Sequence, residues 1–455
     1  MESNKNAFLG TEPIGKLLFR LALPTVLAQL INMLYNIVDR MYIGRIPLYG
    51  EFALTGVGVC MPLIIIVSAF AALIGSGGGP RASIFMGKQD MVTAERILGG
   101  CFTLQLVLSA VLTPALLLWS EDFLLLFGAS AKTIGYARDY MQIYALGTVF
   151  VQLTLGMNAF ITAQGFTKIT MTSVLIGAIS NIILDPICIF VLDMGVKGAA
   201  LATVLSQALS CTWGVSFLWG KKCVLGLKLK NLNLSPKILL PCMALGFAFF
   251  VMQASESVIS LSFNTSLLKY GGDRAVGAMT ILTAVMQFAM LPPQGIAQGA
   301  QPLLSYNYGA KNADRVKKTF RLLLLVSIIY SVSLWALVVA FPRSFVWIFT
   351  NDKLLAVFAE KALRVYFMGM IFFGIQIACQ MTFVSLGKSG CSVLVAVVRK
   401  FILLLPLIFI MPRLLEDPTM GVYSAEPIAD ILAVIFTSIL FGIQFKKALK
   451  QIQSI

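Results

Sequence analysis

The chain contains no histidine and few charged residues. Only 12% of its 455 residues are Asp, Glu, Lys or Arg, whereas 58% are hydrophobic. Soluble proteins of this size carry about twice that share of charge. The absence of histidine excludes an imidazole proton relay and any histidine metal site. The composition therefore predicts an all-α polytopic membrane protein.

Motifs for metal, disulfide or nucleotide chemistry are also missing. The eight cysteines are scattered, mostly inside apolar runs, without the spacing of a metal site or a disulfide framework. The glycines at 75–79 lack the Gly-Lys-Ser/Thr ending of a phosphate-binding loop. We therefore expect neither an enzyme nor a bound cofactor, and any transport must be driven by an ion gradient.

The apolar runs are long enough to cross a bilayer and predict twelve transmembrane helices. They lie at about 17–43, 53–77, 97–119, 139–163, 170–192, 198–219, 237–268, 274–298, 320–341, 363–385, 393–412 and 428–445. The connections between them are short, so no separate soluble domain is expected.

The formal net charge of +15 comes from Lys and Arg residues in the short loops between these spans. The loops on the side of the two termini hold most of them, which favours a cytoplasmic location for both ends. We expect a multi-pass protein of the plasma (inner) membrane that works as a monomer in the lipid bilayer. Basic loops of this kind indicate topology, so nucleic acid is not an expected partner.

The two halves of the chain repeat at an offset of 222 residues, as in the pairs Gly77/Gly299 and Gly87/Gly309. The offset equals six spans, an even number, so the halves share one orientation as a parallel repeat. We expect an N-terminal six-helix lobe at 1–219, a cytoplasmic linker at 220–237 and a C-terminal six-helix lobe at 238–455. Two like halves around a central cavity suit alternating access, whereas a channel more often repeats as subunits.

Two acids lie inside apolar spans of the N-terminal half. Asp185 interrupts the run at 170–192 and is followed by Pro186, while Asn181 lies one turn earlier on the same face. Asp39 ends the first span. Counting from the basic residues at the start of each helix places the two carboxyl groups at similar depth. An acid inside the membrane is costly unless it is paired, hydrated or protonated, so its default interpretation is functional.

Thr203, in the sixth span, falls at nearly the same depth. Two acids, an amide and a hydroxyl at one level make an oxygen-rich cluster that suits a proton or a hard cation such as Na⁺. Other interpretations stay open at this point. Asp39 precedes Arg40 and is also compatible with an ordinary interfacial acid, and Asn181 and Thr203 are compatible with helix–helix hydrogen bonding.

The C-terminal half differs chemically, because the repeat partners of the two acids are leucines near 261 and 407. Glu256 lies at similar depth in the seventh span, where it either titrates or faces an outer vestibule. We expect Arg399 and Lys400 to extend toward the cytoplasm. The rest of the central cavity is expected to be apolar, with methionines adapting to varied shapes.

Several motifs, each weak alone, occur in one order along almost the whole chain. They are Pro24 and Asp39 with Asn36 between them, Gly44 at the end of the first span, Pro80-Arg-Ala-Ser-Ile-Phe-Met-Gly87, Asn158 followed by Ala163-Gln164-Gly165, and Gln301-Pro-Leu-Leu-Ser-Tyr-Asn-Tyr-Gly-Ala310. Together with the repeat, this set resembles the MATE (multidrug and toxic compound extrusion) transporters.

The resemblance implies a secondary active antiporter that exports organic cations and other drugs in exchange for H⁺ or Na⁺. Asp39, Asn181, Asp185 and Thr203 match the cation site in the N-terminal lobe of the prokaryotic DinF-type branch. The NorM-type branch relies on an acid in span ten, where this chain has Ile375 and Gln376.

Further candidates for the site are Asn36, Asn158, Gln376 and Glu256, the last at the position of the span-seven acid of the NorM-type branch. Two rival functions stay open. A lipid-linked oligosaccharide flippase is expected to line its cavity with basic residues, and a membrane-embedded enzyme needs a catalytic cluster.

Overall fold

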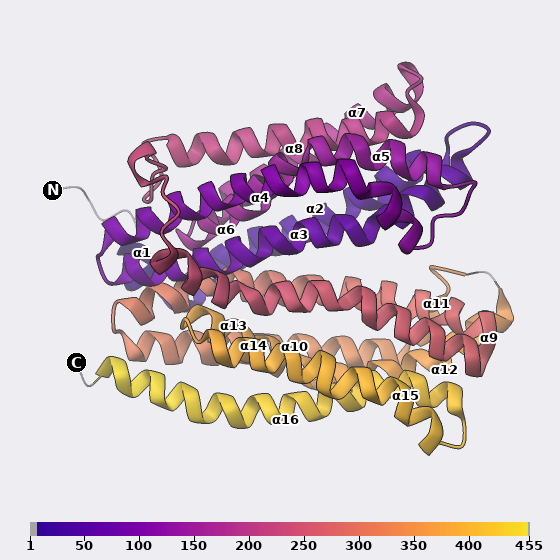
Figure 1. The fold of residues 1–455 in the computed structure, drawn as a ribbon. Helices are drawn as coiled ribbons and strands as arrows, with labels where there is room; N and C mark the ends of the chain where they lie inside the picture. The colour runs from indigo at the N-terminus through magenta and orange to yellow at the C-terminus, as the bar shows by residue number, and fades with distance from the viewer. Residues whose placement is uncertain (1–6, 351, 454–455) are drawn as a thin grey trace.

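The computed structural model describes residues 7–350 and 352–453, which form helices and short connections. Figure 1 shows two bundles lying side by side along their length. The first bundle contains α1 (Ala7–Thr11), α2 (Ile14–Gly44), α3 (Gly50–Gly87), α4 (Met91–Leu126), α5 (Ile134–Leu146), α6 (Thr148–Ala163), α7 (Thr167–Pro186), the π-helical turn η1 (Ile187–Val191) and α8 (Gly195–Trp219).

The connection to the second bundle contains a short helical turn, η2 (Leu229–Asn231). The second bundle contains α9 (Pro236–Gly309), α10 (Ala313–Ala340), α11 (Pro342–Val346), α12 (Lys353–Tyr366), η3 (Phe367–Gly369), α13 (Met370–Ser385), α14 (Ser389–Val397), the π-helical segment η4 (Val398–Leu404), α15 (Leu405–Leu414) and α16 (Pro418–Gln453).

The described residues form twelve membrane spans, as predicted. Ten helices are long and apolar enough to cross a bilayer, and α5 with α6 makes an eleventh span bent by 57°. The 74 residues of α9 are too long for one crossing, since a helix of that length extends about 110 Å. The chain reverses inside α9 at Gly272, where φ is 65°, and this divides α9 into two spans.

The helix boundaries repeat at the offset found in the sequence. Helix α3 runs over Gly50–Gly87, and the second part of α9 runs from Gly272 to Gly309. Helix α6 (Thr148–Ala163) likewise corresponds to α13 (Met370–Ser385). The parallel repeat in the predicted fold is therefore confirmed.

The start of the last span was predicted too late. Helix α16 begins at Pro418 rather than near residue 428, so it contains Glu426 as well as Asp430, which the predicted span already included. The two acids lower the local hydropathy, which is why a pattern based on apolar runs excludes the first turns of this helix.

The two bundles pack most closely where the repeated glycines lie. A Cβ atom on Gly77 of α3 would overlap the backbone carbonyl of Cys242 on α9. Its repeat partner Gly299 on α9 presses in the same way against the backbone of α2 at Ala22. These glycines let helix backbones of the two halves approach directly, so the repeat marks a contact between the bundles.

Gly77→Ala is expected to lower the thermal stability of the protein. The new methyl group must push α9 away from α3, and overpacking of this kind costs roughly 1–3 kcal/mol. Gly58→Ala in the same helix is the matched control, since nothing lies within 4 Å of its Cβ position. Thermal unfolding followed with a thiol-reactive dye would measure both variants, and equal midpoints would contradict this account of the contact.

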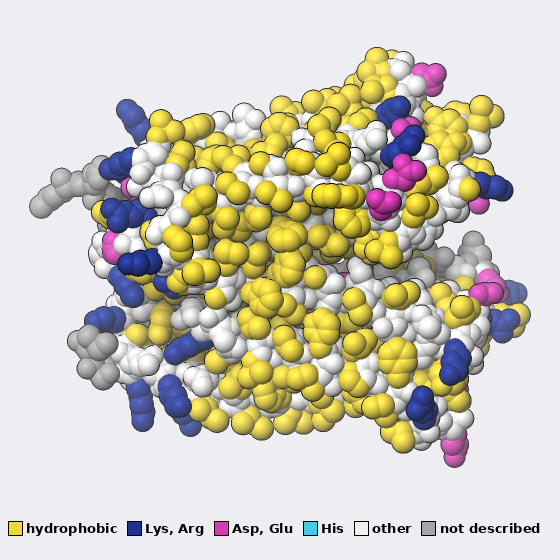
Figure 2. All heavy atoms as spheres, viewed as in Figure 1, with side chains coloured by type: hydrophobic (Ala, Val, Ile, Leu, Met, Phe, Trp, Pro, Cys, Tyr) yellow, Lys and Arg dark blue, Asp and Glu magenta, His cyan; other side chains and the backbone are white. Residues whose placement is uncertain are grey.

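The contacts between the bundles gather at the end of the molecule where α1 and the last turn of α16 lie (Figure 1). Lys and Arg side chains are concentrated at this end (Figure 2), which we call the basic end. Farther from this end, Thr25 Oγ1 donates to the carbonyl of Gly295 across the bundles at 2.6 Å. At the opposite end the space-filling view shows a notch between the two halves. The two bundles are therefore in contact at the basic end and separated at the opposite end.

Helix α1 ties the two halves together at the basic end. Its Leu9 side chain is fully buried among apolar residues of the N-terminal bundle. The backbone carbonyl of Leu9 accepts hydrogen bonds from Asn307 Nδ2 at 2.9 Å and Arg315 Nη2 at 3.2 Å. The same Arg315 nitrogen also donates to the carbonyl of Glu12 at 2.8 Å. One short helix thus contacts both bundles.

Helices α4 and α10 occupy equivalent positions in the two halves, and residues related by the 222-residue repeat cap their first turns. Asp90 Oδ1 accepts from the Thr93 amide at the start of α4, and Asn312 Oδ1 accepts from the Arg315 amide at the start of α10. The hydrogen bonds from Thr93 lower the pKa of Asp90 below its ordinary value of 3.8. The cap therefore adds stability above that ordinary value, and this stability is lost as the pH falls through the lowered pKa.

Asp90→Ala is expected to destabilise the protein by about 1 kcal/mol, the usual cost of removing an N-cap. Asp90→Asn is the matched control, because asparagine caps the equivalent helix at residue 312. Thermal unfolding midpoints at neutral pH would separate the two variants. A cap of no importance would leave Asp90→Ala as stable as Asp90→Asn.

Candidate functional site

Two buried carboxyl groups face each other between α2 and α7. Asp39 is 9% exposed and Asp185 is fully buried, and their side chains interact directly. Asp185 is the next-to-last residue of α7, which ends at Pro186 and is followed by the π-helical turn η1, where the regular hydrogen-bond pattern changes. The structure thus brings together two acids that lie far apart in the sequence, both within the N-terminal bundle.

Asn181 completes the buried group. It is 1% exposed, and its Nδ2 donates to Asp185 Oδ1 at 3.1 Å from one turn earlier on α7. Thr203 on α8 is half-buried and lies with Asn181 on the wall of a small cavity of about 50 Å³. All four predicted cation-site residues therefore lie in one region, with Thr203 at its edge.

Two tyrosines also belong to this region, although they were not predicted. Tyr35 lines the small cavity and interacts with Asp39, and Tyr140 on α5 interacts with both Asp39 and Thr203. Tyr35 precedes Asp39 by four residues, so the helical period indicates that both lie on one face of α2. No sequence pattern links Tyr140 to the acids, because that proximity depends on how α5 packs.

Three oxygen atoms of this group have no hydrogen-bond partner among the described residues. They are Asp39 Oδ1, Asn181 Oδ1 and Asp185 Oδ2, all buried. Neither acid forms an ion pair with Lys or Arg in the part of the chain described. Unpaired oxygens on buried acids suit a small bound cation or a shared proton.

The further candidates lie in different surroundings. Asn36 is exposed and donates to the carbonyl of Asn32 on its own helix. Asn158 is buried on α6 and donates to Ser173 Oγ at 3.4 Å. Gln376 is buried on α13, and Glu256 forms an ion pair with Lys400, so these two belong to the C-terminal bundle. Of the four, Asn158 and Asn36 lie beside the acid region, since Asn158 lines the small cavity and the side chain of Asn36 interacts with Tyr35.

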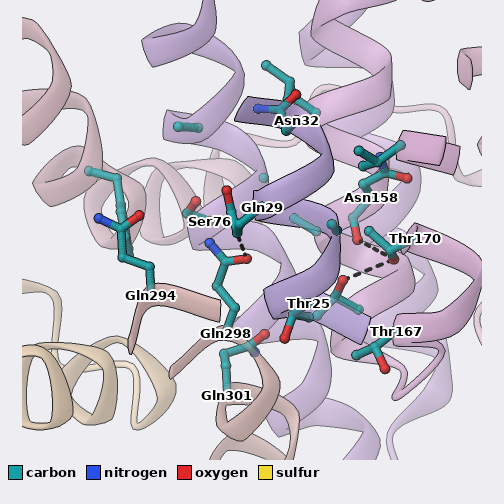
Figure 3. Close-up of a pocket in the computed structure, with 18 of the residues that line it drawn as sticks. Thr25, Gln29, Asn32, Ser76, Asn158, Thr167, Thr170, Gln294, Gln298 and Gln301 are labelled. Atoms are coloured by element: carbon teal, nitrogen blue, oxygen red, sulfur yellow. Dashed lines mark hydrogen bonds between the residues drawn. The ribbon is translucent and has the colours of Figure 1, made fainter. Parts of the chain in front are cut away.

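A central cavity of about 470 Å³ lies between the two bundles, next to the small cavity. Asn32 and Asn158 line both, so the central cavity and the acid region share a wall. Figure 3 shows side chains from both halves pointing into the space, among them Gln29 on α2 and Gln298 on α9. Gln29 Nε2 donates to Gln298 Oε1 at 3.2 Å across the bundles.

The prediction of an apolar cavity was only partly right, since apolar side chains such as Met171, Phe249 and Met381 share the wall with many polar ones. Hydroxyl groups and seven amide side chains line the central cavity, without any charged side chain among the described residues. The amides are Gln29, Asn32, Asn158, Gln253, Gln294, Gln298 and Gln301. The spacing of Gln294, Gln298 and Gln301 places them on one face of α9, a signal that the overall hydropathy hides. The cavity therefore offers many hydrogen bonds and no fixed charge.

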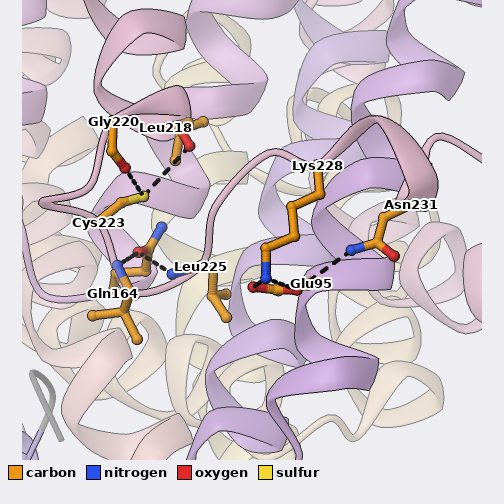
Figure 4. Close-up of polar contacts among 9 residues, drawn as sticks. Glu95, Gln164, Leu218, Gly220, Cys223, Leu225, Lys228 and Asn231 are labelled. Atoms are coloured by element: carbon orange, nitrogen blue, oxygen red, sulfur yellow. Dashed lines mark hydrogen bonds and ion pairs between the residues drawn. The ribbon is translucent and has the colours of Figure 1, made fainter. Parts of the chain in front are cut away.

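The motif at the end of α6 joins the inter-bundle linker to the N-terminal bundle (Figure 4). Gln164 Oε1 accepts from the backbone amides of Val224 and Leu225 at 2.9 and 2.8 Å. The linker is held a second time where Lys228 Nζ meets Glu95 at 2.6 Å. Gln164 is fully buried, so this contact is structural and lies outside the acid region.

The C-terminal bundle contains charged groups whose surroundings were predicted wrongly. Arg399 does not extend toward an aqueous surface but is buried, with Nε 2.7 Å from Asp430 Oδ1 and Nη2 3.4 Å from Glu426 Oε1. Lys400 is also buried, with Nζ 2.8 Å from Glu256 Oε1. The two cations remain inside because acids on neighbouring helices neutralise them.

Comparison with known proteins places this arrangement in a family. A family model described as MatE matches residues 24–187 and 248–410, once in each half and over more than half of the chain. The chain belongs to the MatE family. This confirms the resemblance to multidrug and toxic compound extrusion transporters, and it makes the chain a membrane transporter rather than an enzyme. Assignment to the DinF-type branch stays a prediction.

Relatives of this MatE-family chain match along its whole length. It is 26% identical over 437 residues to the multidrug export protein MepA of Staphylococcus haemolyticus, covering 95% of each chain. A crystal structure of MATE in the bent conformation superposes with a TM-score of 0.93 at 20% identity, covering all of both chains. The outward-facing conformation of a multidrug resistance MATE family transporter superposes at 0.91 with 20% identity, covering 98% of this chain and 99% of the other.

Proposed function

We propose that this chain exports organic cations and related drugs in exchange for H⁺ or Na⁺. The observation that carries the proposal is a buried pair of acids with unpaired oxygens, sharing a wall with a cavity between two repeated bundles. The shared wall allows a change at Asp39 and Asp185 to alter the cavity. The name of the related export protein supports small drugs as the substrates.

The charge of the acid pair gives the coupling a physical basis. A cation bound to Asp39 and Asp185 removes negative charge from a buried site and favours a conformation in which the site is shielded. Release of that cation at the basic end restores the negative charge, which favours a positively charged drug in the adjoining cavity. A ligand shifts the equilibrium between the two conformations only by the difference in its affinity for them. The coupling ion and the drug are therefore exchanged because both are attracted by the negative charge of Asp39 and Asp185.

Flipping of a lipid-linked oligosaccharide is the alternative, and the cavity argues against it. A pyrophosphate group needs basic side chains, whereas amides and hydroxyls line the central cavity. Arg399, the main basic candidate from the sequence, is neutralised by Asp430 and Glu426. An uncharged cavity next to two acids is better suited to a cationic drug.

We further propose that the basic end faces the cytoplasm of the plasma membrane and that the protein works as a monomer. The concentration of Lys and Arg at that end supports the orientation. With the basic end closed, the conformation described here is then open to the outside, ready to release a drug and take up a cation.

Efflux of a fluorescent organic cation from reconstituted vesicles tests the function. A pH gradient and a Na⁺ gradient are imposed separately on vesicles containing the wild-type protein, with protein-free vesicles as the control. Efflux driven by one gradient supports antiport and identifies the coupling ion. Equal efflux with and without both gradients would refute ion-coupled export and leave lipid flipping as the next activity to assay.

A further inference from the structure

A charged cluster in the C-terminal bundle contains Arg399 and Lys400 on η4, Glu426 and Asp430 on α16, and Glu256 on α9. Arg399 bonds to both acids of α16, and Lys400 bonds to Glu256. The guanidinium carbon of Arg399 also lies 5.0 Å from the ring centre of Phe373, a cation–π distance. The cluster lies apart from the Asp39–Asp185 region, in the other bundle.

The cluster occupies the counterpart of the acid region in the internal repeat. Shifting by 222 residues relates α2, α7 and α8 of the N-terminal bundle to the first part of α9, to α14–α15 and to α16. Lys400 corresponds to Ala178, one turn before Asn181, and Glu426 corresponds to Val204, next to Thr203. Glu256 corresponds to Leu34, next to Tyr35. The same three helices thus build a polar group in each half.

The two groups differ in their balance of charge. In the N-terminal bundle, Asp39 and Asp185 face each other without a Lys or Arg ion pair in the described chain. In the C-terminal bundle the side chains of Arg399, Lys400, Glu426 and Asp430 are each 10% exposed or less, two cations against two anions.

Glu256, the remaining acid of the cluster, has a side chain that is 57% exposed. It can be solvated on its outer side and does not upset the balance of the buried groups. The buried charges therefore cancel without an added ion.

We propose that Lys400 and Arg399 act as tethered cations in the C-terminal bundle. Their side chains take the place that an exchangeable cation takes in the N-terminal bundle, so the transporter is coupled to one ion site although its fold supplies two. This inference rests on the proposed function of Asp39 and Asp185. Removing the ammonium group of Lys400 leaves an excess buried negative charge, which a proton or Na⁺ then neutralises.

The test counts bound cations on the purified full-length protein, without any transport assay. Protons released on alkalinisation and binding of radioactive Na⁺ are both measured, first for the wild type and for Asp39→Asn/Asp185→Asn. Lys400→Met is then added to that double variant. We expect the wild type to bind one exchangeable cation, the double variant none, and the triple variant one again.

Two control variants in the same background distinguish charge from packing. Lys400→Arg keeps the tethered charge and is expected to bind no cation. Lys400→Met with Glu426→Gln removes one buried charge of each sign, so the remaining buried charges cancel and this variant is also expected to bind none. Lys400→Gln, which keeps a donor toward Glu256, replaces Lys400→Met if that variant does not elute as a folded species.

The outcomes separate this inference from the proposed function. If the Asp39→Asn/Asp185→Asn change removes a cation but Lys400→Met and Lys400→Gln restore none, the tethered-cation proposal is wrong while the N-terminal site stands. If the wild type and Asp39→Asn/Asp185→Asn bind equal numbers of cations, the proposed coupling site itself is wrong.

Discussion

Asp185→Asn is expected to reduce gradient-driven efflux to the level of protein-free vesicles while leaving the protein folded. Asparagine has nearly the shape of aspartate, but its side chain carries no charge and takes up no proton near neutral pH. Its amide oxygen can still accept the hydrogen bond from Asn181 Nδ2, now made to Asp185 Oδ1 at 3.1 Å. Asp185→Asn should therefore lose the coupling of efflux to the ion gradient and keep its fold. The vesicle assay with both gradients measures this loss.

Asp193→Asn is the control for this prediction. Asp193 follows η1, is exposed and has a φ of 50°, a backbone conformation that asparagine also accepts. It removes one negative charge near the same helix end without touching the buried pair, so efflux should be unchanged. Asp39→Asn should match Asp185→Asn, and combining the two should add little, because residues that act as a unit are not additive. Gradient-driven efflux that survives in Asp185→Asn would contradict the mechanism.

Arg399→Met is expected to destabilise the protein by about 3–5 kcal/mol, because it leaves two buried acids without their cation. Glu426 and Asp430 have side chains that are only 9% and 4% exposed, so water cannot replace the guanidinium group. Lys400→Met should be tolerated far better, since its direct partner Glu256 is largely exposed and a bound proton or Na⁺ can replace the buried charge that it removes. Yield of monodisperse protein and the thermal unfolding midpoint measure the effect.

Two further variants test whether the loss comes from charge. Arg413→Met on α15 removes an exposed arginine and should leave the midpoint unchanged. Arg399→Met combined with Glu426→Gln and Asp430→Asn removes Arg399 together with both of its acid partners and should regain much of the lost stability. If the combined variant is no more stable than Arg399→Met alone, the destabilisation reflects packing and this explanation fails.

Hydropathy and the internal repeat were sufficient to predict twelve spans and two parallel halves, because both depend on the pattern along the chain. The buried acid pair was predicted from depth, since Asp39 and Asp185 lie at similar distances from basic residues at the start of their helices. That counting could not identify Tyr140, which comes near Asp39 only because α5 packs against α3 and α8.

The C-terminal bundle was predicted less well for a related reason. Hydropathy treats each charged residue as a boundary, so Arg399 was assigned to an aqueous surface and α16 was begun after Glu426. The ion pairs that allow both to lie inside connect residues 27 and 31 positions apart on different helices. A one-dimensional pattern does not show such compensation, and the polar part of the cavity wall was missed because its amides are spread over the otherwise apolar helices α2, α6 and α9.

The position of α1 has a consequence for how the transporter responds to solvent. The carbonyl groups of Leu9 and Glu12 are bonded to Asn307 and Arg315 while the basic end is closed. When the halves separate at that end, these oxygens and their donors must be hydrated instead. Opening therefore takes up water, and osmotic stress from a solute too large to enter should slow the export cycle without changing how tightly the protein binds a drug while its basic end is closed.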